Sequence, residues 1–279
     1  MTVFPSSFPS SPADFAVVAR LRAAGCVFAE DEAQLLIAAA DSPAELDAMV
    51  ERRVVGLPLE HVIGWAEFCG LRVSVDPGVF VPRVRTGFLV EQALAAARGL
   101  PEPVVVDLCC GSGAVGAALL AALDRVELHA VDIDPAAVRC ARRNIGAGGQ
   151  VHQGDLYRPL PAGLRGRVDV LVANAPYVPT DAIGLLPAEA RIHEARVALD
   201  GGADGLDIQR RVAAAALDWL APGGRLLVET SDRQAPYSVE AFTAGGLTAR
   251  VVADEERDAT VVVGGRSGVG DGAEFMPTT

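Results

Sequence analysis

The chain has 279 residues, of which 51% are hydrophobic and 22% are charged, and its formal net charge is −12 at pH 7. This length allows one large domain or two unequal domains with a sizeable core, and the composition is ordinary for a globular protein. All 24 basic residues are arginine, which excludes lysine Schiff-base and lysine-nucleophile chemistry. The acidic balance argues against a broad nucleic-acid footprint but leaves room for a local basic patch.

The chain also lacks the marks of a membrane or secreted protein. No apolar run reaches the length of a membrane span, and residues 1–11 do not show a basic-then-apolar signal peptide. The five cysteines do not form the Cys-x-x-Cys spacing of a metal site, so we predict reduced, buried thiols and no metal centre. We expect a cytoplasmic monomer that binds no membrane.

The amino-terminal part has the apolar spacing of helices over residues 13–24 and 30–40. A third helix is predicted to begin at Ser42 and to run to about Arg53. Ser42 can cap it, Pro43 fits its first turn, and Glu45 can complete a capping box. With one more short turn over residues 57–64, these elements predict a small helical domain over residues 1–66.

Residues 67–84 have a different pattern. Short strands are predicted at 68–75 and 79–81, broken at Gly70 and at Asp76-Pro77-Gly78, which indicates a hairpin linker between two domains. Thr86 then stands where it can cap a helix that runs to about Arg98.

From Val104 onward strands and helices alternate, which is typical of a doubly wound α/β sheet. We predict strands at 104–108, 127–131, 151–155, 168–173 and 225–229, with a closing antiparallel pair at 247–253 and 259–264. Helices are predicted to end near 123 and to cover 136–145 and 210–220, and a turn is predicted at Pro222-Gly223-Gly224. The α/β domain is expected over residues 85–266, followed by a disordered tail at 267–279.

A glycine loop follows the first strand of this domain. Gly111-Ser112-Gly113-Ala114-Val115-Gly116 satisfies G-x-G-x-x-G and opens a helix. Such a loop lets the backbone approach a ligand and directs amide donors toward it. The loop alone does not choose between a dinucleotide and S-adenosylmethionine.

Aspartates at the strand ends favour the methyl donor. Asp107 stands ahead of the loop, where the donor's cationic amino-acid end needs an anion. Asp132 ends the next strand and can accept from both ribose hydroxyls, which fits either cofactor. Asp155 ends the third strand and can accept from an adenine amino group, whereas we interpret Asp134 as a helix cap.

The fourth strand leads into Asn174-Ala175-Pro176-Tyr177, at the edge where open α/β sheets bind ligands. Pro176 disfavours the helical region for Ala175, so backbone carbonyls stay available beside the Asn174 carboxamide. Acceptors beside the flat face of Tyr177 suit a planar group that carries an NH2. The same residue types also occur in ordinary strand-to-loop turns.

The chain resembles the HemK/PrmC family of protein-(glutamine-N5) methyltransferases, which modify class-I translation release factors, from about Pro58 to Arg266. The resemblance is carried by residues 58–64, 79–83, 111–116, 174–177 and 193–206. It implies a helical substrate-docking domain, a seven-stranded Rossmann-like class I methyltransferase domain, S-adenosylmethionine as cofactor, and a release factor as protein substrate. The family has N-P-P-Y where this chain has Ala175 as second residue, and Arg-Pro-Glu/Asp-Thr where this chain has Arg83-Val84-Arg85-Thr86; Cys109 replaces the first glycine of the loop.

The candidate site residues fall into three groups, for catalysis, substrate binding and cofactor binding. The candidates for catalysis are Asn174, Ala175, Pro176 and Tyr177, and those for substrate binding are Asn174, Tyr177, Arg83 and Glu194. The cofactor candidates are Asp107, Cys109, Gly111, Ser112, Gly113, Asp132, Ile133, Asp155, Leu156 and Asn174. Glu194 could seat the substrate or could simply form a surface ion pair.

The predicted chemistry is N5-methylation of a glutamine side chain, with Asn174 Oδ1 and the Ala175 carbonyl holding its N–H bonds. The alternative is adenine-N6 methylation of DNA or RNA, because the same acceptors could hold a flipped base. A nicotinamide-dependent oxidoreductase would leave residues 174–177 unexplained. A non-catalytic module would keep the cofactor fold but would have lost activity at Ala175.

Overall fold

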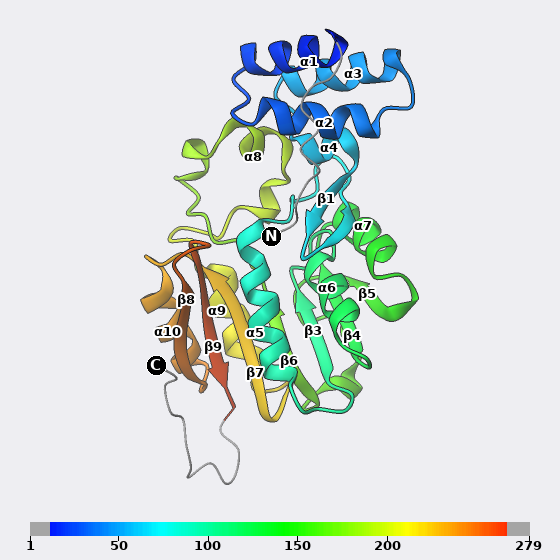
Figure 1. The fold of residues 1–279 in the computed structure, drawn as a ribbon. Coiled ribbons are helices and arrows are strands. Elements are labelled where there is room, and N and C mark those ends of the chain that lie inside the picture. The colour runs from blue at the N-terminus through cyan, green and yellow to red at the C-terminus, as the bar shows by residue number, and fades with distance from the viewer. Residues whose placement is uncertain (1–11, 267–279) are drawn as a thin grey trace.

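The computed structural model describes residues 12–266, so the predictions for residues 1–11 and for a tail at 267–279 lie outside the described residues. Figure 1 shows a helical part at one end of the molecule and an α/β sheet at the other, joined by a hairpin. Within the described part, no helix has both the length and the apolar character needed to cross a membrane.

The helical part is a bundle with its own core. Its helices are α1 (Pro12–Ala23), α2 (Ala29–Ala39), α3 (Pro43–Val54) and α4 (Leu59–Ile63). Leu21, Leu36 and Val50 are fully buried in this core. Ser42 caps α3 as predicted, accepting from the Glu45 N–H at 3.2 Å. The Glu45 carboxylate accepts from the Asp41 N–H instead of the Ser42 N–H. The reciprocal bond of the predicted capping box is therefore shifted by one residue toward the amino terminus.

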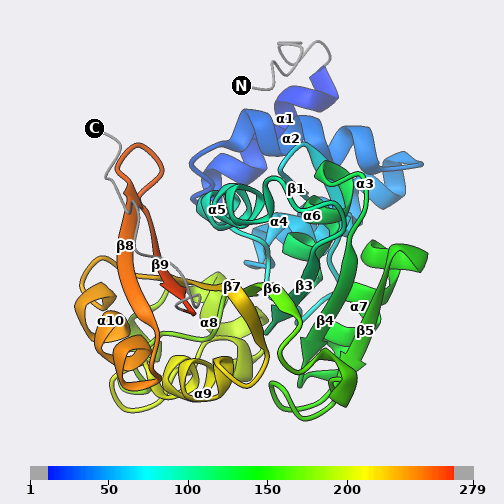
Figure 2. The ribbon, with the colours of Figure 1, turned by 90° about the horizontal axis from the view of Figure 1, so that it is seen from below.

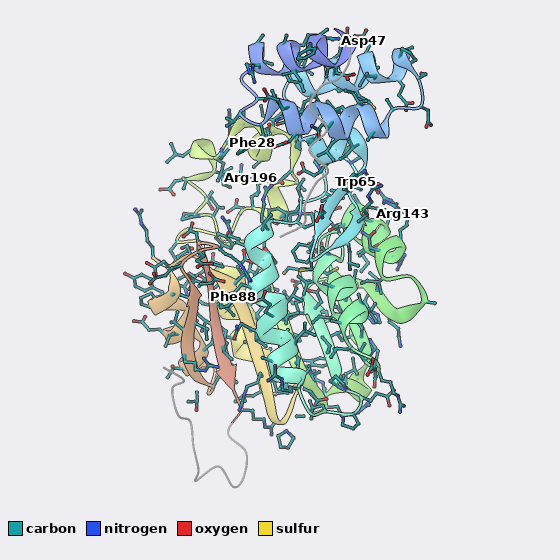
Figure 3. All side chains as sticks on the ribbon, in the orientation of Figure 1. Phe28, Asp47, Trp65, Phe88, Arg143 and Arg196 are labelled. Atoms are coloured by element: carbon teal, nitrogen blue, oxygen red, sulfur yellow. The ribbon has the colours of Figure 1, made fainter. Side chains whose placement is uncertain are left out.

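The linker contains β1 (Trp65–Phe68) and β2 (Leu71–Ser74), which pair antiparallel around Cys69 and Gly70. The predicted hairpin is therefore confirmed, with its turn at Gly70. The predicted strand at 79–81 is wrong, because these residues do not pair in a sheet. The neighbouring Gly78 forms an isolated bridge to Glu194. Figure 3 labels Trp65 in β1 and Arg143 in α7 (Pro135–Ile145). The Arg143 guanidinium donates to the Asp76 carboxylate at 2.6 Å and ties the linker to the α/β domain.

The α/β domain is built on a seven-stranded sheet with the order β5-β4-β3-β6-β7-β9-β8. Its strands are β3 (Val104–Leu108), β4 (Glu127–Asp132), β5 (Gly149–Gln153), β6 (Val168–Ala173), β7 (Leu220–Thr230), β8 (Thr248–Asp254) and β9 (Ala259–Gly265). β3 to β7 pair in parallel, whereas β9 is antiparallel to both β7 and β8. The predicted doubly wound sheet with a closing antiparallel pair is confirmed.

Helices cover both faces of this sheet, as Figure 2 shows from below. They are α5 (Gly87–Ala97), α6 (Ala114–Ala122), α7 (Pro135–Ile145), α9 (Asp207–Ala216) and α10 (Ala235–Ala244). Side chains of α5, α6 and α7 pack in one core cluster with one face, and those of α9 and α10 pack in a second cluster with the other. Because both faces are covered, the central strands β3 and β6 are mostly apolar and their sequences show no regular alternation of apolar and polar residues.

Several local predictions are corrected by the structure. Thr86 does not cap α5: its backbone is helical and its side chain makes no cap bond. The predicted turn at 222–224 lies inside β7, where the register to β6 shifts and Gly223 has a φ of +80°. The sequence predicts no element at 235–244, where α10 forms, because buried Ser238 and exposed Tyr237 break its amphipathic pattern.

A segment between β6 and α9 joins the two parts of the molecule. It contains α8 (Ala188–His193) and lies between the helical bundle and the sheet (Figure 1). Arg53 of α3 bonds Glu189 of α8 at 2.5 Å and Glu32 of α2 at 2.6 Å. Arg53 is 9% exposed, so this cation is one of the buried polar side chains that fix the bundle against the α8 segment.

Candidate active site

The site lies where the sheet reverses its winding direction, because β3 has β4 on one side and β6 on the other. In open α/β sheets a crevice forms at this point, beyond the carboxyl ends of the strands. A cavity of about 550 Å³ occupies it here. Its walls come from the β3–α6 loop, the ends of β4 and β5, the segment after β6, the linker and the α8 segment.

Most of the predicted residues meet in this cavity. Its lining includes Arg83, Asp107, Cys109, Gly111, Ser112, Asp132, Ile133, Asp155, Leu156, Asn174, Ala175, Pro176 and Tyr177. Gly113 and Glu194 are not among the lining residues. The structure therefore brings together residues that stand on five different strands or loops, as the strand-end argument requires.

The glycine loop owes its shape to backbone conformations that side chains disfavour. Gly111 and Gly113 have φ values of +54° and +78°, and Cys109 also has a positive φ of +57°. A Cβ at Gly113 would lie 3.0 Å from the Ala141 Cα, so this glycine allows the loop to pack against α7. Gly113 thus lies on the side of the loop that packs against α7, which explains why it does not line the cavity.

Two carboxylates stand on either side of the loop, Asp107 buried and Asp132 half-buried. Asp107 is 2% exposed, and its Oδ2 accepts from the Gly116 N–H at 3.2 Å. Burial raises the pKa of Asp107 to about 7; the Gly116 N–H opposes this rise, and nearby Asp132 adds to it. Burial also raises the pKa of Asp132, whose oxygens accept from the backbone N–H of Gly111 at 2.8 Å and of Asp134 at 2.9 Å.

The cavity wall at the ends of β4 and β5 combines apolar and charged groups. Ile133 is 50% exposed, and Leu156 is buried with a φ of +50°. The Asp155 carboxylate is held by Arg211 of α9, through bonds of 2.7 and 2.6 Å. Asp155 is thus on the cavity wall as predicted, but its charge is already matched. Asp134 caps α7 by accepting from the Ala136 N–H at 2.9 Å, in agreement with its interpretation as a cap.

The segment after β6 presents its polar groups to the cavity. The Asn174 Nδ2 donates to Thr86 Oγ1 at 3.3 Å, which leaves Oδ1 as the free end of the carboxamide. Ala175 is 1% exposed, and among residues 12–266 neither its N–H nor its carbonyl has a hydrogen-bond partner. The Tyr177 hydroxyl accepts from Arg85 Nη2 at 2.6 Å, and its carbonyl accepts from Gln234 Nε2 at 2.9 Å.

Arg83 and Glu194 bond each other. Arg83 Nη2 donates to both Glu194 oxygens, at 2.6 and 2.8 Å, and the Val81 N–H donates to Glu194 at 3.2 Å. Glu194 is 6% exposed, so it is a buried anchor between the linker and the α8 segment and not part of a surface pair. Arg83 keeps a third of its side chain exposed at the cavity wall.

Sequence reasoning missed three residues around this segment: Arg85, Thr86 and Glu229. Thr86 was predicted to cap a helix, and Glu229 was predicted only to end a strand. The available signal for Glu229 was an acid directly after the apolar run Leu226-Leu227-Val228, at the carboxyl end of a central strand.

The comparison with known proteins agrees with this geometry. A family model described as Methyltransferase small domain matches residues 70–205. A release factor glutamine methyltransferase of Geobacter sulfurreducens is 38% identical over 233 residues, covering 81% of this chain and 80% of that protein. A 4-amino-L-phenylalanine/4-methylamino-L-phenylalanine methyltransferase of Streptomyces pristinaespiralis is 37% identical over 205 residues, covering 71% and 69%.

A solved structure with a similar fold is also a methyltransferase. The crystal structure of a methyltransferase from Pyrococcus furiosus is similar with a TM-score of 0.51 and 16% identity, over 71% of this chain and 90% of that one. At that identity it supports the fold alone, and the identity to the Geobacter sulfurreducens protein carries the assignment. The resemblance drawn from the motifs is therefore confirmed: the chain belongs to the family of release factor glutamine methyltransferases, which are S-adenosylmethionine-dependent enzymes.

Proposed function

We propose that this protein methylates the side-chain nitrogen of a glutamine in a class-I translation release factor, with S-adenosylmethionine as methyl donor. The observation that carries the proposal is the Asn174 carboxamide, which Thr86 holds by its Nδ2 so that Oδ1 is left as an acceptor at the cavity. Beside it, the Ala175 carbonyl has no partner among residues 12–266. A primary amide has two N–H bonds, which match these two acceptors.

The residues after β6 act by orientation. An amide nitrogen is a poor nucleophile because its lone pair is delocalised into the carbonyl. Asn174 Oδ1 and the Ala175 carbonyl would hold both N–H bonds and aim the nitrogen along one direction, while the Tyr177 ring packs against the amide plane. The rate gain comes from this positioning and from acceptors that are already in place when positive charge develops on the nitrogen. As the nitrogen forms its bond to the methyl carbon, the bond from that carbon to the sulfonium sulfur would break and leave a neutral thioether. The nitrogen would then release its proton to solvent.

The residues present fit the methyl donor. The glycine loop approaches closely because Gly111 and Gly113 adopt positive φ, and the cavity continues from this loop to Asn174. Asp132 would hold the ribose hydroxyls, and Asp107 the cationic amino-acid end. Ile133 and Leu156 would enclose the adenine, with Asp155 near its amino group. When bound, S-adenosylmethionine supplies an electrophilic methyl group on a sulfonium sulfur.

Donor affinity should depend on pH through Asp107. Because its pKa in the free protein is raised to about 7, Asp107 becomes protonated below that pH and cannot pair with the donor's ammonium group. The affinity should be level above pH 7 and should fall below it, by up to about tenfold per pH unit. Titration calorimetry with S-adenosylmethionine between pH 8 and pH 6 measures this. Equal affinities at both pH values would remove Asp107 from the ammonium site, and Asp107→Asn should bind weakly with a flat profile.

Ala175→Pro restores the family's usual second residue and removes an N–H that has no partner in the described structure. The carbonyl that is proposed to hold the amide remains. We therefore expect glutamine methylation of a release factor to be preserved or raised, with a more constrained turn. A steady-state assay of the variant and the parent protein decides this. A loss of activity would show that the Ala175 N–H contributes to this protein's own specificity.

The function itself is tested by offering labelled donor together with alternative acceptors. A purified release factor, single-stranded DNA and 4-amino-L-phenylalanine would be compared in parallel reactions. We expect label in the release factor. Label confined to DNA would favour the adenine-N6 alternative, and label confined to 4-amino-L-phenylalanine would assign the chain the acceptor of its Streptomyces relative.

A further inference from the structure

Glu229 is a buried acid next to the proposed catalytic segment, residues 174–177. The proposed mechanism gives Glu229 no role. It stands near the end of β7, and the pairing of Ala173 with Val228 places it next to Asn174, the first residue after the neighbouring strand β6. Glu229 is 2% exposed, and among the described residues neither carboxylate oxygen has a partner in hydrogen-bond geometry. A buried carboxylate is costly unless neighbouring groups compensate it.

The groups that compensate this carboxylate come from the end of the linker. Burial raises the pKa of Glu229, and the Thr86 side chain and the Arg85 and Arg83 guanidinium groups oppose that rise. The Arg85 Nε lies 3.6 Å from Glu229 Oε1. Arg85 and Thr86 belong to the 3₁₀ turn Val84–Thr86, which lies directly before α5. Glu229 therefore faces this turn from the sheet.

The same two residues hold the two polar side chains of the catalytic segment. Arg85 donates to the Tyr177 hydroxyl at 2.6 Å, and Thr86 accepts from Asn174 Nδ2 at 3.3 Å. Arg85 and Thr86 line the cavity, whereas Glu229 does not. Glu229 thus lies on the far side of Arg85 and Thr86 from the cavity. Arg85 connects it to Tyr177, and Thr86 connects it to Asn174.

We propose that Glu229 is a positioning residue, which fixes the Asn174 carboxamide through Thr86 and the Tyr177 ring through Arg85. Without its charge, Arg85 loses its anion. The arginine side chain is 41% exposed and can turn toward water, away from Tyr177. Without a hydroxyl at position 86, the carboxamide can rotate and present Nδ2 instead of Oδ1 to the substrate. Loss of the Glu229 charge and loss of the Thr86 hydroxyl would each misalign the groups that hold the substrate amide. Neither would alter the residues proposed to bind S-adenosylmethionine.

The test rests on the proposed function for its activity readout, so it includes a second readout that does not. Glu229→Gln keeps the size of the side chain and removes its charge, and Thr86→Val removes the hydroxyl. Each should lower kcat for glutamine methylation by about 10- to 10²-fold, the scale of a misplaced reacting group. The affinity for S-adenosylmethionine should stay within about twofold of the parent value, because no donor contact changes.

Matched variants separate positioning from general damage. Thr86→Ser keeps the hydroxyl and should retain most of the activity. Glu240→Gln makes the same change on the exposed surface of α10 and should behave as the parent protein. The double variant Glu229→Gln with Thr86→Val should lose less than the product of the single effects, because both act on one network.

Nuclear magnetic resonance of the Asn174 side-chain NH2 in the donor-bound protein supplies the second readout. In the parent protein this group should give one pair of signals, and in Thr86→Val and Glu229→Gln these should shift or broaden. If both variants keep the parent kcat, or if the Asn174 signals are unchanged, the positioning role is wrong. If the parent protein does not methylate a release factor at all, the proposed function fails, while the resonance data still decide the role of Glu229.

Discussion

Asn174→Ala should lower the rate of methyl transfer to glutamine by about 10²–10³-fold, the scale of a deleted oxyanion-hole donor, and should leave donor affinity nearly unchanged. The reason is geometric: the variant removes the Oδ1 acceptor, while the glycine loop and the aspartates that are proposed to hold the donor remain. Single-turnover rates and calorimetry on the same preparation separate the two effects. Methyl transfer at the parent rate would make Asn174 a turn residue and would contradict the proposed mechanism.

Asn174→Asp is the more selective companion variant. It keeps an acceptor at the same position but removes the NH2 that donates to Thr86 and adds a negative charge near the donor's sulfonium. We expect activity between those of the parent and the alanine variant. An aspartate variant as inactive as the alanine variant would show that the bond to Thr86 matters as much as the acceptor itself.

Asp132→Ala should weaken binding of S-adenosylmethionine by at least about tenfold, because it removes one or two hydrogen bonds to a charged acceptor, each worth about 1.5–3 kcal/mol. The structure adds a second reason. Asp132 accepts from the Gly111 N–H, so the variant also loosens the glycine loop. Calorimetry measures the affinity, and circular dichroism checks that the fold is kept.

Asp134→Ala is the matched control for this prediction. It removes the cap of α7 two residues further on and should cost about 1 kcal/mol of stability with little change in donor affinity. If Asp132→Ala binds the donor as tightly as the parent protein, Asp132 does not hold the ribose.

The sequence was informative where local chemistry determines the structure. The buried run Val104–Leu108 and the aspartates at strand ends could be placed because parallel strands end at one edge of the sheet. The glycine loop could be placed because its positive φ values favour glycine. These features are local or follow from topology, and they located most of the cavity wall.

Contacts between distant segments could not be predicted in this way. Thr86 has a sequence context that suits a helix cap, yet its hydroxyl meets Asn174, 88 residues further along the chain. Asp155 was expected to be open to the adenine, but Arg211 reaches it from α9, 56 residues away. Neither partner leaves a periodic pattern in the sequence, because each pair is created only when the sheet brings its elements together.

Glutamine methylation is tested most directly by mass spectrometry of a purified release factor after incubation with this protein and S-adenosylmethionine. We expect the mass of one added methyl group on a single glutamine side chain. A release factor in which that glutamine is replaced by alanine should stay unmodified, and Asn174→Ala should give little product in the same time. A release factor that remains unmodified, or a methyl group on any residue other than glutamine, would contradict the proposed glutamine methylation.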